Sequence, residues 1–272
     1  REELLANPDV HAVYVATEHH RHCEDVLACA AAGKQVLCEK PMANSVADCR
    51  RMIEACAAHG VALQVAYYRR YYPKLVQMRE MLHAGAIGEP VTASIHLAHR
   101  LARDKIGPAN WRLNAEVSGG GQLVDTGSHR LDLLCWLLGE PDRVAALAEC
   151  QEMPIEATDI ESLLIRMQSG VHAVTRHGYR SNSPDELSVT GTEGTLDATP
   201  VDGPFLRLRG RGREEVIELP KHENVHFPLF DDFTRRVRVG EPVQHPGEAG
   251  MQASRIIEAA YESARSGRIV SA

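Results

Sequence analysis

The sequence predicts part of a doubly wound parallel α/β sheet, followed by an open, mostly antiparallel mixed sheet of the α+β class. Residues 11–66 alternate short apolar runs with helical segments, whereas strand-like segments follow one another after residue 91 with turn signals between several of them. With 272 residues, of which 44% are hydrophobic, the chain is long enough for one or two domains with ample cores.

The N-terminal quarter has the order strand, helix, strand, helix, strand. A first helix is predicted over about residues 20–32, ending at Gly33, and Ser45 with Asp48 marks the start of a second helix, which ends at Gly60. The predicted strands cover residues 11–16, 35–38 and 61–66. This order implies parallel strands joined by right-handed crossovers, as in half of a doubly wound nucleotide-binding fold.

The other half of such a fold would come first and would carry a G-x-G-x-x-G loop for a pyrophosphate. The sequence contains no G-x-G-x-x-G, and it begins at Arg1. We therefore expect a chain from which the glycine-rich half is absent. Strand 11–16 would then present an unpaired edge.

The second part begins with a helix over about residues 73–84 and a turn at residues 87–90, and it closes with helices over 227–239 and 250–266. Strands are predicted over residues 91–98, 143–150, 161–167, 171–177, 186–191, 194–198, 205–209 and 215–219. Together these strands predict one large sheet.

Composition and charge bear on the binding partners and the cellular location of the protein. Net charge is −7 and the basic residues are scattered, which disfavours nucleic acid. The apolar runs are strand-sized, which disfavours a membrane span. Seven cysteines without a C-x-x-C pair predict reduced thiols, no zinc site and a cytoplasmic protein.

Lys40 is the first candidate site residue. Glu39-Lys40-Pro41 follows strand 35–38, and ligands of open α/β sheets bind beyond the carboxyl ends of the strands. The alternative is an ordinary surface lysine at a strand end.

Residues 119–132 are the most informative segment. Three glycines at 119–121 allow close backbone approach, and they precede a predicted helix over about 122–138. Asp125, His129 and Asp132 would share one face of that helix. The opposite side would be apolar, with Leu131, Leu134, Cys135 and Leu138. A solvated polar stripe and a zinc site are the alternatives, but no third cluster of metal ligands accompanies the helix.

Two further segments have the residue types of binding anchors. Trp111 and Arg112 lie just before the glycines, and an aromatic and basic cluster occupies residues 67–73. Stacking on nucleic acid is one interpretation of that cluster. The negative overall charge favours an interdomain or substrate-facing role instead.

In this order and spacing, several segments together resemble the Gfo/Idh/MocA family of glucose–fructose oxidoreductases and inositol dehydrogenases. The segments are residues 7–10, 31–41, 68–73, 85–88, 111–112, 119–129, 191–195 and 259–267. The resemblance implies a Rossmann domain, here represented by its C-terminal half at residues 1–68, and a substrate-binding and oligomerisation domain at residues 69–272. It also implies NAD or NADP as cofactor, and a homodimer or homotetramer built through the large sheet.

The resemblance carries site roles to particular residues. It implies catalytic roles for Lys40, Asp125 and His129. The family's Thr-Pro-Asn motif with a following histidine is replaced here by Thr17-Glu18-His19 with His22, a departure at the nicotinamide ribose. The expected cofactor-binding residues are Ala16, Thr17, His19, His22, Glu39, Lys40, Trp111 and Arg112. The expected substrate-binding residues are Lys40, Arg70, Arg112, Asp125 and His129.

The function implied is hydride transfer between a nicotinamide and a ring carbon of a sugar, inositol or related polyol. His129 would act as base, Asp125 would orient the substrate or stabilise an imidazolium, and Lys40 would bind the reacting oxygen. Two alternatives stay open: a non-catalytic scaffold that has lost its cofactor loop, and a metal-dependent hydrolase.

Overall fold

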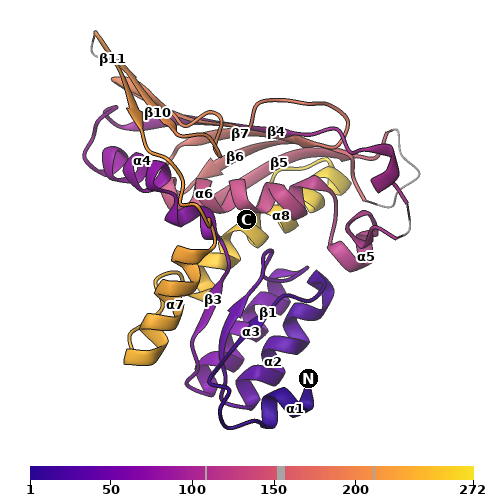
Figure 1. Cartoon of the computed structure of the whole chain (residues 1–272). Helices are drawn as coiled ribbons and strands as arrows, with labels where there is room; N and C mark the ends of the chain where they lie inside the picture. The colour runs from indigo at the N-terminus through magenta and orange to yellow at the C-terminus, as the bar shows by residue number, and fades with distance from the viewer. Residues whose placement is uncertain (108, 152–156, 211) are drawn as a thin grey trace.

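A computed structural model describes residues 1–107, 109–151, 157–210 and 212–272, and it arranges them around two sheets (Figure 1). The smaller sheet has three parallel strands and the larger has nine strands. Both predicted sheet types are therefore confirmed. None of the described helices is long and apolar enough to cross a membrane.

The smaller sheet has the strand order β1-β2-β3. The elements of this region are α1 (Glu2–Ala6), β1 (Ala12–Val15), α2 (His22–Ala31), β2 (Gln35–Cys38), α3 (Val46–Ala58) and β3 (Leu63–Val65). The predicted start of α3 is confirmed, because the Ser45 hydroxyl accepts the Asp48 backbone N–H at 3.0 Å. Gly33, with φ +68°, follows the end of α2 in the left-handed region that the prediction required.

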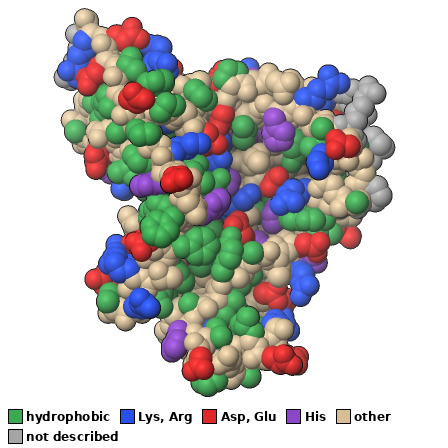
Figure 2. Space-filling model, in the orientation of Figure 1, with side chains coloured by type: hydrophobic (Ala, Val, Ile, Leu, Met, Phe, Trp, Pro, Cys, Tyr) green, Lys and Arg blue, Asp and Glu red, His purple; other side chains and the backbone are tan. Residues whose placement is uncertain are grey.

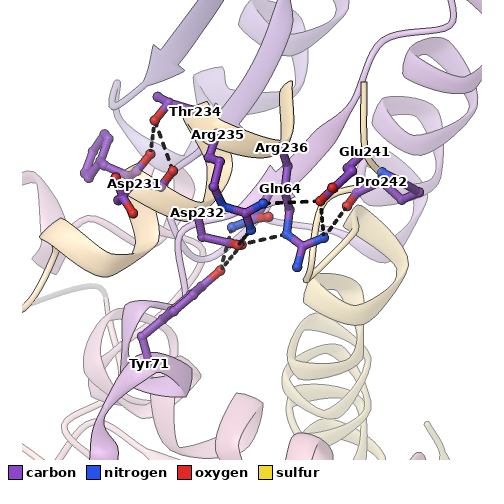
Figure 3. A network of polar contacts seen from close by, with 10 residues as sticks. Gln64, Tyr71, Asp231, Asp232, Thr234, Arg235, Arg236, Glu241 and Pro242 are labelled. Atoms are coloured by element: carbon purple, nitrogen blue, oxygen red, sulfur yellow. Dashed lines mark hydrogen bonds and ion pairs between the residues drawn. The ribbon is translucent and has the colours of Figure 1, made fainter. Parts of the chain in front are cut away.

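A helix from the far end of the chain covers one side of this small sheet. Leu229 and Phe233 of α7 (Phe227–Val239) form a buried cluster with Leu37 and Ala66. A polar network fastens the same helix, because the Tyr71 hydroxyl donates to Asp232 at 3.0 Å (Figure 3). The two ends of the sequence thus build one structural unit.

The larger sheet has the order β11-β10-β9-β8-β4-β7-β6-β5-β12. Its strands are β4 (Pro90–Ala98), β5 (Pro141–Glu149), β6 (Ile160–Met167), β7 (His172–Gly178), β8 (Glu186–Gly191), β9 (Gly194–Asp197), β10 (Phe205–Gly210), β11 (Arg213–Glu218) and β12 (Val270–Ser271). Among the described strand pairs of this sheet, only β4–β7 is parallel, so the sheet is mixed and mostly antiparallel as predicted.

Helices cover the inner face of this sheet. They are α4 (Pro73–His83), α6 (Ser128–Leu138) and α8 (Gly247–Ser266), whereas the short α5 (Ala115–Ser118) packs on the turns at residues 19–21 and 111–113. Helix α8 packs on β5 of the large sheet and on α3 and β3 of the small one, so it joins the two regions (Figure 1). Single turns of 3-10 helix occur at residues 19–21, 68–71, 103–105 and 111–113.

The predicted single helix over residues 122–138 is wrong in its first part. Residues Leu123–Gly127 form a π-helical turn, and α6 begins only at Ser128. A π turn bonds i to i+5 instead of i+4, so it rotates the preceding residues relative to the helix that follows. Asp125 and Asp132 consequently do not form the one polar stripe that α-helical spacing predicted.

Candidate active site

Lys40 and Asp125 meet where the small sheet faces α6. Lys40 follows β2, and its Nζ donates to the backbone oxygen of Asp125 at 2.6 Å and to its carboxylate at 3.2 Å. The two side chains are 15% and 16% exposed. Burial alone would raise the pKa of Asp125, but the charges of Lys40 and Arg112 hold it below its ordinary value. The pair is therefore an ammonium beside a carboxylate at the end of a strand.

His129 lies one helical turn further, in an aromatic enclosure. Its ring contacts Tyr67 and Tyr68 edge-on, with centroids 5.7 and 5.0 Å away. Burial, followed by the positive charges of Arg69 and Lys40, lowers the pKa of His129 well below 6.5. Its buried Nδ1 has no hydrogen-bond partner among the described residues. His129 is therefore a neutral imidazole, the form that accepts a proton.

The aromatic wall continues beyond His129. The Tyr68 ring lies 4.2 Å from the ring of His226, which comes from the segment before α7. On the face drawn in Figure 2, histidine side chains gather across the middle of the molecule beside large hydrophobic ones. The expected substrate-facing role of residues 67–73 remains a prediction, and the structure places Tyr68 of that segment against His129.

His19, Trp111 and Arg112 form the other side of the Lys40–Asp125 pair. The ring of His19 stands edge-on to Trp111 with centroids 4.7 Å apart, and its Nδ1 lies 2.8 Å from the Ser118 backbone oxygen. Burial lowers the pKa of His19 to about 4, so the neutral ring donates this hydrogen bond. The Arg112 guanidinium lies 4.4 Å from the Trp111 ring centroid, and its Nε lies 3.5 Å from the Asp125 carboxylate.

Other expected cofactor residues hold the strand ends together. The two ring nitrogens of His22 each lie 3.0 Å from a backbone oxygen, one of Pro41 and one of Thr17. The Thr17 hydroxyl donates to Asp25 at 2.9 Å, and the Glu39 carboxylate accepts the Lys40 backbone N–H at 2.9 Å. These contacts link the residues after β1, beginning at Ala16, to those after β2.

Arg70 lies apart from this group. Its guanidinium donates to both oxygens of Asp132, at 2.9 and 2.5 Å, and to the Ala249 backbone oxygen at 3.3 Å. The side chains of Arg70 and Asp132 are 4% and 1% exposed. The structure thus brings together Lys40, Arg112, Asp125 and His129 of the expected substrate residues, and it gives Arg70 an internal partner instead.

The glycine segment is held by side chains that the sequence analysis did not single out. The Gly121 N–H donates to the Tyr261 hydroxyl at 3.1 Å, and Gln122 lies with its Nε2 2.6 Å from His99 Nδ1. Glu161 is buried below the same segment. Strand alternation was the available signal, because Glu161 shares its face of β6 with Leu163, Ile165 and Met167.

The same region offers no set of metal ligands. Within residues 1–107, 109–151, 157–210 and 212–272, no three or more histidine, cysteine, aspartate or glutamate side chains group as such a set.

Comparison with known proteins decides the family. The family profile described as "Oxidoreductase family, NAD-binding Rossmann fold" matches residues 1–67, and that described as "GFO/IDH/MocA C-terminal domain" matches residues 75–197. The crystal structure of aldose-aldose oxidoreductase from Caulobacter crescentus, complexed with glycerol, superposes with a TM-score of 0.90 at 31% identity, over 100% of this chain and 82% of that one. The chain belongs to the Gfo/Idh/MocA family.

Two curated members of the Gfo/Idh/MocA family are also similar. Mouse trans-1,2-dihydrobenzene-1,2-diol dehydrogenase is 33% identical over 78% of this chain, and 1,5-anhydro-D-fructose reductase of Ensifer adhaerens is 35% identical over 80% of it. The aligned regions span 62% and 66% of those proteins, which is just under two thirds of each.

Proposed function

We propose that this protein is an NAD(P)-dependent oxidoreductase acting on a CH–OH group of a sugar, inositol or related polyol. The observation that carries the proposal is the Lys40–Asp125 pair at the strand ends, with a neutral, buried His129 beside it. The family profile over residues 1–67 describes an NAD-binding fold, and the similar proteins are named as a dehydrogenase, a reductase and an oxidoreductase. These names do not favour the alternative of a non-catalytic scaffold.

The residues present fit a nicotinamide cofactor. The carboxyl ends of β1 and β2 are the usual ligand edge of such a sheet, and here they present the Lys40 ammonium and the His19 ring. His19, Trp111, Arg112 and Lys40 would hold the cofactor, while residues 16–17, His22 and Glu39 would shape the edge. The bound cofactor would supply the hydride donor or acceptor.

The protein's own groups would handle the proton and the orientation. His129 would take the hydroxyl proton of an alcohol, because its ring is neutral and lies beside Lys40. Lys40 would donate a hydrogen bond to the reacting oxygen. Asp125 would fix the Lys40 ammonium and stabilise the imidazolium that forms at His129.

We also propose the division of the chain at residue 68 and assembly through the larger sheet. Leu147, Leu164 and Val174 are exposed on the outer face of β5, β6 and β7, and Leu164 is paired with Val174. An apolar face of this kind suits a second copy of the chain.

The test is titration of the full-length protein with NADH and NADPH, followed by turnover on a panel of sugars, inositols and polyols. We expect His129→Asn to lower kcat by about 100-fold or more, with little change in the coenzyme Kd. Lys40→Met should lower kcat and also weaken coenzyme binding. The matched control is Lys105→Met, at an exposed lysine. Failure of the wild type to bind either coenzyme would refute the function. An equal loss of kcat and coenzyme affinity in His129→Asn would refute the assignment of the base.

A further inference from the structure

The glycine segment 119–121 rests on side chains that leave no room for anything larger than glycine. A Cβ at Gly121 would lie 2.6 Å from the Glu161 carboxylate and would collide with the Thr158 backbone oxygen, and a Cβ at Gly120 would collide with the Tyr261 hydroxyl. Two of these contacts come from β6 and the residues before it, and one comes from α8. Together they fix the path of the backbone just before the Asp125 turn.

A directional chain of hydrogen bonds runs from this backbone to a buried carboxyl group. The Gly121 N–H donates to the Tyr261 oxygen at 3.1 Å, and the Tyr261 and Thr158 hydroxyls lie 3.2 Å apart. The Thr158 hydroxyl donates to Glu161, so the Tyr261 hydroxyl is left to donate to Thr158. Each hydrogen bond fixes the donor direction of the next, and this series of hydrogen bonds ends on Glu161.

Glu161 also touches the turn directly. It is 0% exposed, and the backbone of Leu123, two residues before Asp125, acts to lower the pKa of its carboxyl group. Its second oxygen has no partner among the described residues. Glu161 therefore lies against Gly121, at the entry of the π turn, and near Leu123, its first residue.

We propose that Glu161 is a positioning residue that, through Thr158 and Tyr261, holds the turn that presents Asp125 to Lys40. The proposal rests on the proposed function for its catalytic consequence. Its structural content, the control of the Asp125 turn by Glu161, is measurable without coenzyme or substrate.

The surroundings of Glu161 make its protonation state matter. Burial raises the pKa of Glu161 to about 7, against the opposing effects of the Thr158 hydroxyl and the Leu123 backbone, and the like charge of Asp159 raises it further. His177 lies opposite on β7, and its own pKa is lowered by burial to about 3, so it brings no positive charge. Tyr179 and Tyr261 face the group as neutral phenols, since burial raises their pKa values.

Loss of the proton near neutral pH therefore places an uncompensated carboxylate under the Asp125 turn. The pKa of Glu161 is raised above its ordinary value, so its protonated form is favoured below about pH 7. The arrangement of the turn should change as the pH rises through that value.

Trp111 can report this change. The chain has two tryptophans, and in a Trp136→Phe background the tryptophan emission comes from Trp111 alone. Arg112 stacks on Trp111 and pairs with Asp125, so a shift of the turn alters the surroundings of the indole. The experiment is a fluorescence titration of the full-length protein from about pH 3 to about pH 9, with circular dichroism to verify folding.

We expect a transition near pH 7 that is absent in Glu161→Gln and retained in Thr175→Val. Thr175 is the matched control, because it is buried on the neighbouring strand and its hydroxyl has no partner among the described residues. A second transition near pH 4, from protonation of His19, should persist in every variant. A transition near pH 7 that survives in Glu161→Gln would overturn the proposal.

Tyr261→Phe keeps the test decisive if Glu161→Gln does not fold. It removes the hydroxyl that links Gly121 to Thr158 and leaves the carboxyl group intact. We expect the Trp111 response near pH 7 to shrink, and an undiminished response would overturn the proposal.

Turnover supplies an independent readout, measured with whichever sugar, inositol or polyol the substrate panel identifies. We expect kcat of Glu161→Gln to stay close to the wild-type value below pH 7, because the amide mimics the neutral carboxyl group and keeps an acceptor oxygen for Thr158. The coenzyme Kd should be unchanged, and the pH profile should no longer bend near pH 7. An unaltered pH profile would contradict the positioning role. A third outcome is that Glu161→Gln loses the fluorescence transition while the wild type binds no coenzyme. That outcome would support the role of Glu161 in holding the turn and would refute the proposed function.

Discussion

Two ion pairs anchored about two turns apart on one helical segment differ in what surrounds them. Asp132 on α6 binds Arg70 through two hydrogen bonds, and both side chains are almost wholly buried. Asp125 on the π turn binds Lys40, and each side chain of that pair keeps contact with solvent. Burial leaves the pKa of Asp132 raised despite Arg70, whereas Lys40 and Arg112 lower that of Asp125.

The difference separates a pair that holds the fold from a pair that can exchange partners. The Asp132 side chain is 1% exposed, and Arg70 has further contacts to Ala249 and His245. Among the described residues, Lys40 bonds only to Asp125, through its backbone oxygen and its carboxylate, and it lies just after the carboxyl end of β2. The same residue chemistry therefore suits stability at one site and, under the proposed function, reactivity at the other.

The largest expected effect comes from breaking the buried pair. Arg70→Met leaves the Asp132 carboxylate buried without its partner, and we expect the free energy of unfolding to fall by about 3–5 kcal/mol. Urea denaturation followed by circular dichroism measures it. The double variant Arg70→Met with Asp132→Leu should recover much of the loss, since it removes the uncompensated charge. A loss below about 1 kcal/mol in the single variant would show that Asp132 finds another partner.

A smaller and pH-dependent effect is expected at Asp125. Its pKa in the folded protein lies below the ordinary value of 3.8, so its contribution to stability is fully present above pH 3.8. That contribution is lost as the pH falls through the folded pKa. We expect Asp125→Asn to be about 1.5 kcal/mol less stable than wild type at neutral pH, and the gap should close in acid. Denaturation at several pH values checks this, and a gap that widens below pH 3.8 would contradict the assigned sign.

The sequence predicted both sheets because their signals are local. Strand 35–38 and helix 227–239 appear with the predicted bounds, since alternation, capping and turn residues fix them within a few positions. The packing of Phe233 on Leu37 of the small sheet was not predicted, because these residues are about two hundred positions apart in the sequence. Such long-range packing leaves no local pattern.

The site was predicted only where a motif marked it. Lys40 and Asp125 are brought together by a contact between residues 85 apart, which the family resemblance implied and spacing alone did not. The π turn was missed because helical periodicity assumes 3.6 residues per turn, so Asp132 was placed with Asp125 instead of with Arg70. Glu161 was missed because a charged residue on an inner strand face was not weighed.

The smallest expected effect tests whether exposure is what distinguishes the two pairs. Arg112 is 47% exposed and its Nε lies 3.5 Å from Asp125, so solvent screens the attraction. We expect Arg112→Met to change the free energy of unfolding by less than about 0.5 kcal/mol, and to raise the pKa of Asp125 slightly because one of the charges that lower it is gone. Denaturation at low and high salt measures the first effect. A loss as large as that of Arg70→Met would mean that geometry at the carboxylate, and not exclusion of water, sets the strength of both pairs.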